Sequence, residues 1–196
     1  WLEADLSDLY GRATAGLRVA PGRPAGRTSG RSLSRGGPGA ELLQIWERSR
    51  SLPGGKRLFS LLVGLRAPDS GSIGAIVREL EPGRSVVTLS DRRSVRNHLR
   101  SVHAIALTNL GELSSGLAML TALPPGTRGI VVDLKVGFAK KARGLLTATG
   151  TAVGPTLDSL AEDDDVEALA TAVIRDSERD VVAEVSVRWR IGIVAN

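Results

Sequence analysis

The run VHAIALTNLGELSSGLAMLTAL occupies residues 102–123 of a 196-residue chain and contains almost only apolar and small side chains. Glu112 is the one residue in this run that is expected to be ionised at pH 7. The run is long enough to suggest a membrane span, but His103, Asn109 and Glu112 interrupt it. The pattern therefore predicts a long helix buried inside a soluble fold. Pro124-Pro125-Gly126 marks the end of that helix.

Six segments with strand-like patterns surround this helix. Two precede it, Ile73–Leu80 and Ser85–Leu89, on either side of the turn signal EPGR at residues 81–84. Four follow it, and these are Ile130–Phe138, Leu145–Val153, Val166–Ile174 and Val181–Ile191. A strand-rich chain with one central apolar helix predicts an α+β fold in which an antiparallel sheet wraps around that helix.

Two of the later segments alternate between apolar and polar side chains. In the last one, every second residue from Val181 to Ile191 is apolar, and the residues between them include Glu184, Ser186, Arg188 and Arg190. In the first one, the residues expected to share a face are Ile130, Val132, Leu134, Val136 and Phe138. We therefore expect each of these two strands to bury one face.

Two shorter apolar segments precede the strands. The stretch ELLQIWERSR, residues 41–50, has apolar residues at helical spacing, and Pro53-Gly54-Gly55 ends it. A second apolar segment covers Leu58 to Val63. We expect order to begin at Glu41, so that residues 41–196 form one domain with an N-terminal helical segment.

Residues 1–40 are expected to form a disordered tail rich in Arg, Gly and Pro. The net charge of the chain is +5, but residues 11–40 contain no acid and six arginines, which are Arg12, Arg18, Arg23, Arg27, Arg31 and Arg35. The remainder of the chain is therefore close to neutral. Because the positive charge belongs to this tail and not to a folded surface, we expect no nucleic-acid partner.

The composition also restricts the chemistry. The chain has no cysteine and only two histidines, His98 and His103, so disulfides are excluded and a metal site is not expected. We expect a cytoplasmic protein without a metal or redox cofactor and without a membrane partner.

The stretch RNHLRSVHAIALTNLGELSSG, residues 96–116, carries a recognisable constellation. Asn97 lies six residues before His103, Ala104 follows the histidine, and Glu112 lies nine residues beyond it. This spacing resembles the active-site segment of hotdog-fold thioesterases of the phenylacetate-degradation type, and the chain looks most similar to a poorly characterised thioesterase-like branch. The resemblance covers about Leu52 to Ile193 and includes the stretch FAKKARG, residues 138–144.

The resemblance implies a hotdog fold and hydrolysis of an acyl-CoA or other acyl thioester, with coenzyme A entering only as part of the substrate. It also implies a site shared across a homodimer, to which one subunit contributes Asn97, His103 and Ala104 and the other contributes Glu112. Two such dimers can further pair into a homotetramer. The family usually has two glycines after the histidine, whereas here Ala104 and Ile105 stand in those places.

Elementary chemistry supports the same roles. A thioester carbonyl becomes an oxyanion in the transition state, and the start of a long helix offers backbone N–H groups, such as that of Ala104, to stabilise it. Glu112 is the acid available as base or nucleophile. Nine residues of α-helix, the spacing from His103 to Glu112, turn about 900°. The helix start and Glu112 are therefore expected on opposite faces, which favours a site built from two copies of the helix.

Plainer interpretations stand beside these. Glu112 can be a structural acid, His103 a helix cap, and Asn97 a turn residue. Asn109, one turn before Glu112, either orients the carboxylate or makes a helix contact.

The basic cluster Lys140, Lys141 and Arg143 either binds the phosphates of coenzyme A or is a solvated strand end. Two alternatives to hydrolysis also remain. One is a non-catalytic module that binds acyl thioesters or regulates, which the Ala104-Ile105 departure favours, and the other is hydration or dehydration of an acyl thioester.

Overall fold

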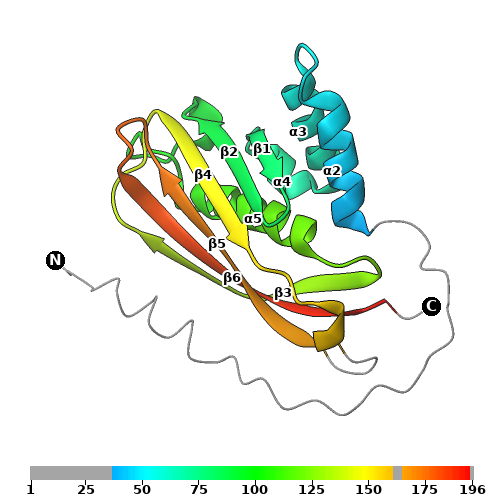
Figure 1. Ribbon diagram of the computed structural model, residues 1–196. Helices are drawn as coiled ribbons and strands as arrows, with labels where there is room; N and C mark the ends of the chain where they lie inside the picture. The colour runs from blue at the N-terminus through cyan, green and yellow to red at the C-terminus, as the bar shows by residue number, and fades with distance from the viewer. Residues whose placement is uncertain (1–36, 161–164, 195–196) are drawn as a thin grey trace, which may run out of the picture. The chain divides into compact units, whose positions relative to one another are not determined.

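A six-stranded antiparallel sheet carries the long helix α5, Ala104–Ala122, against one of its faces (Figure 1). The computed structural model describes residues 37–160 and 165–194. The strands are β1 Ile76–Glu81, β2 Arg84–Ser90, β3 Thr127–Phe138, β4 Leu145–Ala152, β5 Val166–Arg175 and β6 Val181–Ile193. Their spatial order is β1-β2-β4-β5-β6-β3, so that β1 and β3 are the two edges. A sheet wrapped around one central helix is the arrangement expected of a hotdog fold.

Helix α5 is buried almost all round because small residues let it approach the sheet closely. A Cβ atom on Gly150 of strand β4 would lie 2.2 Å from the backbone oxygen of Ser114, and one on Gly111 would lie 2.2 Å from a methyl group of Val185. The Ser85 hydroxyl donates a hydrogen bond of 2.7 Å to the same Ser114 carbonyl. These contacts fix where α5 lies on the sheet, and therefore where its side chains point.

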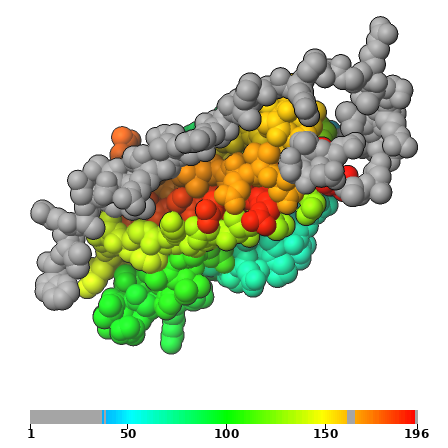
Figure 2. Space-filling view, turned by 90° about the horizontal axis from the view of Figure 1, so that it is seen from below, coloured from blue at the N-terminus to red at the C-terminus, as the bar shows by residue number. Residues whose placement is uncertain are grey.

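Strand β6 alternates as its sequence predicts from Ala183 onward, and Ala183, Val185, Val187, Trp189 and Ile191 are all buried. The prediction is wrong at Val181, which is only half-buried while Val182 is buried, because the pairing with β5 shifts register at this point. Figure 2 shows the strands β3, β6 and β5 side by side on the sheet.

Strand β3 departs from the predicted alternation. A β-bulge between Val131 and Asp133 shifts the register, so that Val131 is opposite Trp189 and Leu134 is opposite Val187. The prediction that Ile130 shares a face with Leu134 is therefore wrong: Ile130 is opposite Arg190, because one extra residue in a strand reverses the side on which the next residues point. The apolar residues around the bulge remain substantially exposed along this edge of the sheet.

Three helices precede the sheet: α2 Pro38–Ser49, α3 Gly55–Arg66 and α4 Pro68–Ser72. The rings of Trp46 in α2 and Phe59 in α3 meet edge to face, with 5.2 Å between their centroids. Helix α2 begins three residues before the predicted start of order, and the other predictions for the tail fall on residues 1–36, which lie outside the described residues.

The short helix α4 was not predicted. Its sequence, PDSGS, has no apolar periodicity, and Ile73, which the sequence pattern assigned to a strand, is instead the residue that ends this helix. None of the described helices combines the length and the apolar character that crossing a membrane would require.

Candidate functional site

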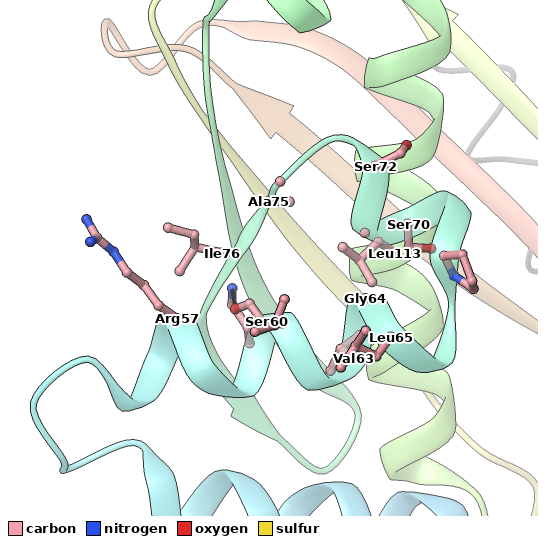
Figure 3. Close-up of a pocket in the computed structure, with 15 residues that line it drawn as sticks. Arg57, Ser60, Val63, Gly64, Leu65, Ser70, Ser72, Ala75, Ile76 and Leu113 are labelled. Atoms are coloured by element: carbon pink, nitrogen blue, oxygen red, sulfur yellow. Dashed lines mark hydrogen bonds between the residues drawn. The ribbon is translucent and has the colours of Figure 1, made fainter.

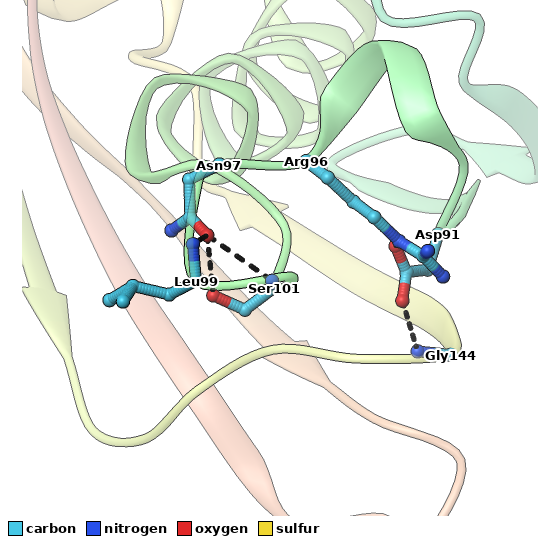
Figure 4. Close-up of polar contacts among 6 residues, drawn as sticks. All are labelled: Asp91, Arg96, Asn97, Leu99, Ser101 and Gly144. Atoms are coloured by element: carbon cyan, nitrogen blue, oxygen red, sulfur yellow. Dashed lines mark hydrogen bonds and ion pairs between the residues drawn. The ribbon is translucent and has the colours of Figure 1, made fainter.

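The loop before α5 is a tight turn organised by Asn97. Its side-chain oxygen accepts hydrogen bonds from the Leu99 N–H at 2.9 Å and from both the N–H and the hydroxyl of Ser101 at 3.2 Å (Figure 4). Arg100 completes the turn with a positive φ of 56°. Asn97 therefore holds the loop in shape, as the turn interpretation expects, and its half-buried side chain remains at the surface of the site.

A largely buried carboxylate anchors this loop to the start of strand β4. Asp91 accepts a hydrogen bond of 2.6 Å from Nε of Arg96 and one of 3.1 Å from the Gly144 N–H (Figure 4). The hydrogen bond from Arg96 is the main reason that the pKa of Asp91 lies below its usual value. The turn around Asn97 is thus fixed at both ends before the helix begins.

His103 is the N-cap of α5. Its Nδ1 atom accepts a hydrogen bond of 3.1 Å from the Ile105 N–H, and the backbone N–H of His103 donates to the Val95 carbonyl at 2.8 Å. The ring nitrogen that caps the helix is unprotonated in this geometry. His103 therefore orients the first turn of the helix.

The exposed Ala104 N–H is a free donor at this helix start. Within the part of the chain that the structure describes, no group accepts a hydrogen bond from it. Ala104 is exposed, and it is the first residue of α5, where the helix dipole is positive. The donor is therefore available to a substrate carbonyl at the surface of the protein.

A small cavity, called here the Asn97 cavity, lies beside this donor. Its volume is about 220 Å³, and its lining includes Asn97, Ala104, Phe138, Lys140 and Lys141. The cavity thus brings together two groups of residues that are separated by more than thirty positions in the sequence.

The basic cluster divides into three different environments. Lys140 forms ion pairs of 2.8 Å with Asp176 and 2.6 Å with Asp180, and the hydrogen bond to Asp176 is the main cause that raises its pKa. Lys141 lines the Asn97 cavity, and none of the ion pairs among the described residues involves it. Arg143 does not line this cavity. Lys141 is therefore the cation of the predicted cluster that is best placed to meet an anionic ligand.

Glu112 lies farther along α5, near Trp189 of strand β6. A Cβ atom on Gly116 would lie 3.7 Å both from Oε1 of Glu112 and from Cζ2 of the Trp189 ring, so the carboxylate and the indole flank this glycine. Burial raises the pKa of Glu112, and within the described residues no donor or cation offsets this effect. The carboxylate is thus partly desolvated and retains its lone pairs for an incoming proton.

The distance along the helix, and not opposite faces, separates the two groups. Helix α5 begins at Ala104, eight residues before Glu112, and eight residues turn about 800°, which leaves only about 80° between them. They are, however, about 12 Å apart along the axis. The prediction of opposite faces is therefore wrong for Ala104, but one copy of the helix still cannot present both groups to one carbonyl.

Two buried polar atoms near Glu112 have no partner among the described residues, and these are Oδ1 of Asn109 and Nε1 of Trp189. The amide nitrogen of Asn109 donates a hydrogen bond of 2.8 Å to the Asp69 carbonyl in α4. This geometry matches the helix-contact interpretation of Asn109. Sequence reasoning missed Trp189, although its inward position in the alternating strand β6 placed it against the central helix.

A larger cavity of about 470 Å³ lies between α3, α4 and β1 (Figure 3). Its lining is mostly apolar and includes Leu61, Val63, Leu65 and Leu113, with Arg57 at one end. We call it the α3–α4 cavity. It contains none of the residues that the sequence singles out, so size alone does not make it the candidate site.

Several solved structures share this architecture. A structural-genomics protein, APC5556, is 26% identical, with a TM-score of 0.65 over 79% of this chain and 99% of its own. A probable thioesterase from Pseudomonas aeruginosa is 23% identical, with a TM-score of 0.60 over 73% of this chain and 97% of its own. A thioesterase family protein from Silicibacter pomeroyi is 18% identical, with a TM-score of 0.57 over 69% and 96%. The predicted fold is confirmed.

The family itself has a neutral description. Residues 55–191 match the family described as Domain of unknown function (DUF4442), and the chain belongs to it. No curated protein matches the chain significantly. The match begins at the first residue of α3, so the family includes α3 and α4 as well as the sheet and α5.

Proposed function

We propose that the protein hydrolyses an acyl thioester at a site formed by two copies of the chain. The observation that carries the proposal is the free Ala104 N–H at the start of α5, which lies beside Asn97 in a cavity of a hotdog fold. Helix α5 also carries the partly desolvated acid Glu112. In the proposed dimer, Glu112 of one copy lies beside the Ala104 N–H of the other. The similarity to thioesterase-family structures supports the same reaction class.

The proposed chemistry uses these two groups in sequence. The Ala104 N–H and the helix dipole stabilise the negative charge on the carbonyl oxygen as water adds to the carbon. Glu112 from the second copy accepts the proton of that water, and its raised pKa brings it nearer to neutral pH, where a base works best. The C–S bond then breaks, Glu112 returns its proton to the departing sulfur, and the products are a carboxylic acid and a free thiol. Direct attack by the Glu112 carboxylate, followed by hydrolysis of the anhydride, gives the same products.

The exposed edge strand β3 supports the assembly that this chemistry needs. Ile130, Val131, Val132 and Phe138 are all exposed along it. An open apolar edge is an aggregation hazard unless another strand pairs with it. Antiparallel pairing of two β3 strands would join the sheets of two copies into a homodimer, and two such dimers can pair further. In this proposal the α5 helices run antiparallel, with the helix start of one near Glu112 of the other.

The carrier part of the substrate is assigned to the Asn97 cavity. Lys141 offers a positive charge there, and Phe138 offers an apolar wall. A coenzyme A thioester combines phosphates with a long neutral arm, so it suits this mixture. Lys140 is held by Asp176 and Asp180 and is expected to contribute less.

One observation favours a second candidate function. The Ile105 side chain is 69% exposed directly after the donor, where the resembling enzymes have glycine, and it narrows access to the carbonyl. A non-catalytic module that binds acyl thioesters would tolerate this restriction.

A free-thiol release assay across acyl-CoA chain lengths tests the proposal. Glu112→Gln is expected to lower turnover by a factor of about 100 or more, whereas the control Glu81→Gln, at an exposed glutamate, is expected to leave it unchanged. Binding of acyl-CoA without thiol release would support the non-catalytic module instead. Equal turnover of wild type and Glu112→Gln would refute the role of this acid.

A further inference from the structure

Helix α3 presents a row of exposed leucines. Leu58, Leu61, Leu62 and Leu65 are 53%, 60%, 40% and 69% exposed, and their spacing places them on one face of the helix. We call these four residues the leucine face. Single exposed leucines are common on proteins, but a contiguous apolar patch usually marks a contact surface.

The leucine face is not the side that holds α3 on the domain. Phe59 and Gly55 on the other side of the helix are buried, and Phe59 packs against Trp46. The helix is therefore anchored without its leucines. Their exposure costs solubility and contributes no packing, which points to an external partner.

Positive charge lies at the start of the leucine face. The helix sequence GKRLFSLLVGLR contains Lys56 and Arg57 at its start and Arg66 at its end, and it contains no acid. Arg66 contacts Glu41 at 3.0 Å, and Lys56 donates to the Arg78 carbonyl at 2.9 Å. Arg57 takes part in none of the ion pairs among the described residues. The surface thus combines apolar side chains with a basic start, whereas the charge of Arg66 at its end is balanced by Glu41.

We propose that the leucine face docks onto an anionic lipid surface. Leucines that enter the boundary between headgroups and acyl chains lose their contact with water, and basic residues at the rim meet the anionic headgroups. The helix would lie on the membrane without crossing it.

Charge argues against one other occupant, the N-terminal segment of the chain. The residues from 11 to 36 carry six arginines and no acid, so that segment has the same sign of charge as the start of α3. An anionic surface is the complementary partner for both.

The α3–α4 cavity opens on the same side of the molecule. Leu61 and Leu65 belong both to the leucine face and to the lining of this cavity (Figure 3). A lipid acyl chain at the docked surface would therefore meet an apolar opening of about 470 Å³. Docking itself does not depend on the proposed hydrolysis.

Vesicle co-sedimentation with the full-length chain tests the proposal. Vesicles of phosphatidylcholine with about 30% phosphatidylglycerol are expected to bind the protein at least about tenfold more tightly than pure phosphatidylcholine vesicles. The double variant Leu58→Gln/Leu62→Gln is expected to lose about tenfold or more of that affinity. Both substituted residues lie outside the cavity lining and are exposed, so the fold should persist, which a thermal melt verifies.

The matched control is Leu145→Gln/Leu157→Gln, because these leucines are similarly exposed but lie elsewhere on the domain. It should bind vesicles as the wild type does. Binding that is unchanged by the Leu58 and Leu62 substitutions would be carried by charge alone and would overturn the proposal. Absence of vesicle binding would overturn it as well. Self-association of the wild type that the double variant abolishes, in the absence of vesicle binding, would assign the leucine face to a second copy of the chain instead.

Discussion

Replacing Ala104 with proline removes the backbone N–H that is proposed to bind the carbonyl oxygen, and it is expected to leave the rest of the site in place. Ala104 is the first residue of α5, the helical position where proline is favoured, and its N–H donates to no group among the described residues. The preceding residue, His103, has φ −66° and ψ 143°, a conformation that is compatible with a following proline. Ala104→Pro therefore deletes the donor and leaves the helix start in place.

The expected magnitude follows from this geometry. Loss of one oxyanion donor typically lowers kcat by a factor of about 100 to 1,000, equivalent to about 3–4 kcal/mol of transition-state stabilisation. The folded state should be unaffected or more stable by about 0.4–1 kcal/mol, because proline restricts the unfolded chain. The matched control Ala104→Ser keeps the N–H and should keep kcat within a few-fold.

Thiol release and thermal melting on the same preparations measure both quantities. A fully active Ala104→Pro enzyme with an unchanged melting temperature would refute the role of this N–H. Mixing provides a second test, because Ala104→Pro chains and Glu112→Gln chains lack different groups. Mixed dimers would contain one site with both groups intact, so partial activity should return. If mixed dimers form and remain inactive, the two groups do not come from opposite subunits.

Four further outcomes are expected. Gly111→Ala should destabilise the fold by about 1–3 kcal/mol in chemical denaturation, because its Cβ would lie 2.2 Å from a methyl group and 2.9 Å from Cβ of Val185. The control Gly116→Ala, whose Cβ would have contacts of 3.7 Å, should be neutral or stabilising by up to about 1 kcal/mol. Glu112→Gln should raise the melting temperature at neutral pH. Burial raises the folded-state pKa of Glu112, so the penalty for its ionised form is present above that pKa and vanishes below the ordinary value of 4.5, where the two melting temperatures should converge. The pH profile of kcat/KM should rise through a pKa above 4.5 that Glu112→Gln abolishes. Asn97→Ala should lower both stability, by about 1–3 kcal/mol, and turnover, because three donors in the turn lose their acceptor.

Local patterns were sufficient to predict most of the fold. The apolar run at residues 102–123 and the alternation in β6 are properties of neighbouring residues, and both appear in the structure with nearly the predicted bounds. The bulge in β3 is different in kind. It depends on pairing with β6, which is more than fifty residues away, and nothing in the β3 sequence itself marks Val132 as the extra residue. Helix α4 was missed because a polar five-residue turn of helix has no period to detect.

The candidate site divides in the same way. The types of Asn97 and His103 and their positions before a helix predict a turn and a cap, and both roles rest on contacts within four residues. By contrast, sequence adjacency made Lys140 and Lys141 look equivalent. Only the fold brings Asp176 and Asp180 to Lys140 and brings Lys141 to the Asn97 cavity. Long-range partners of this kind are set by strand pairing.

The close packing of α5 gives the proposed shared site its precision. Gly111 fixes the helix against Val185 of strand β6, and β6 pairs directly with the edge strand β3. If two copies join through β3, each helix is located relative to the other by a short series of rigid contacts. The donor and the acid are about 12 Å apart on one helix, but each then lies beside its counterpart on the other helix. The pair therefore forms two identical sites. Gly111 is therefore part of the proposed catalytic geometry, even though it does not touch the substrate.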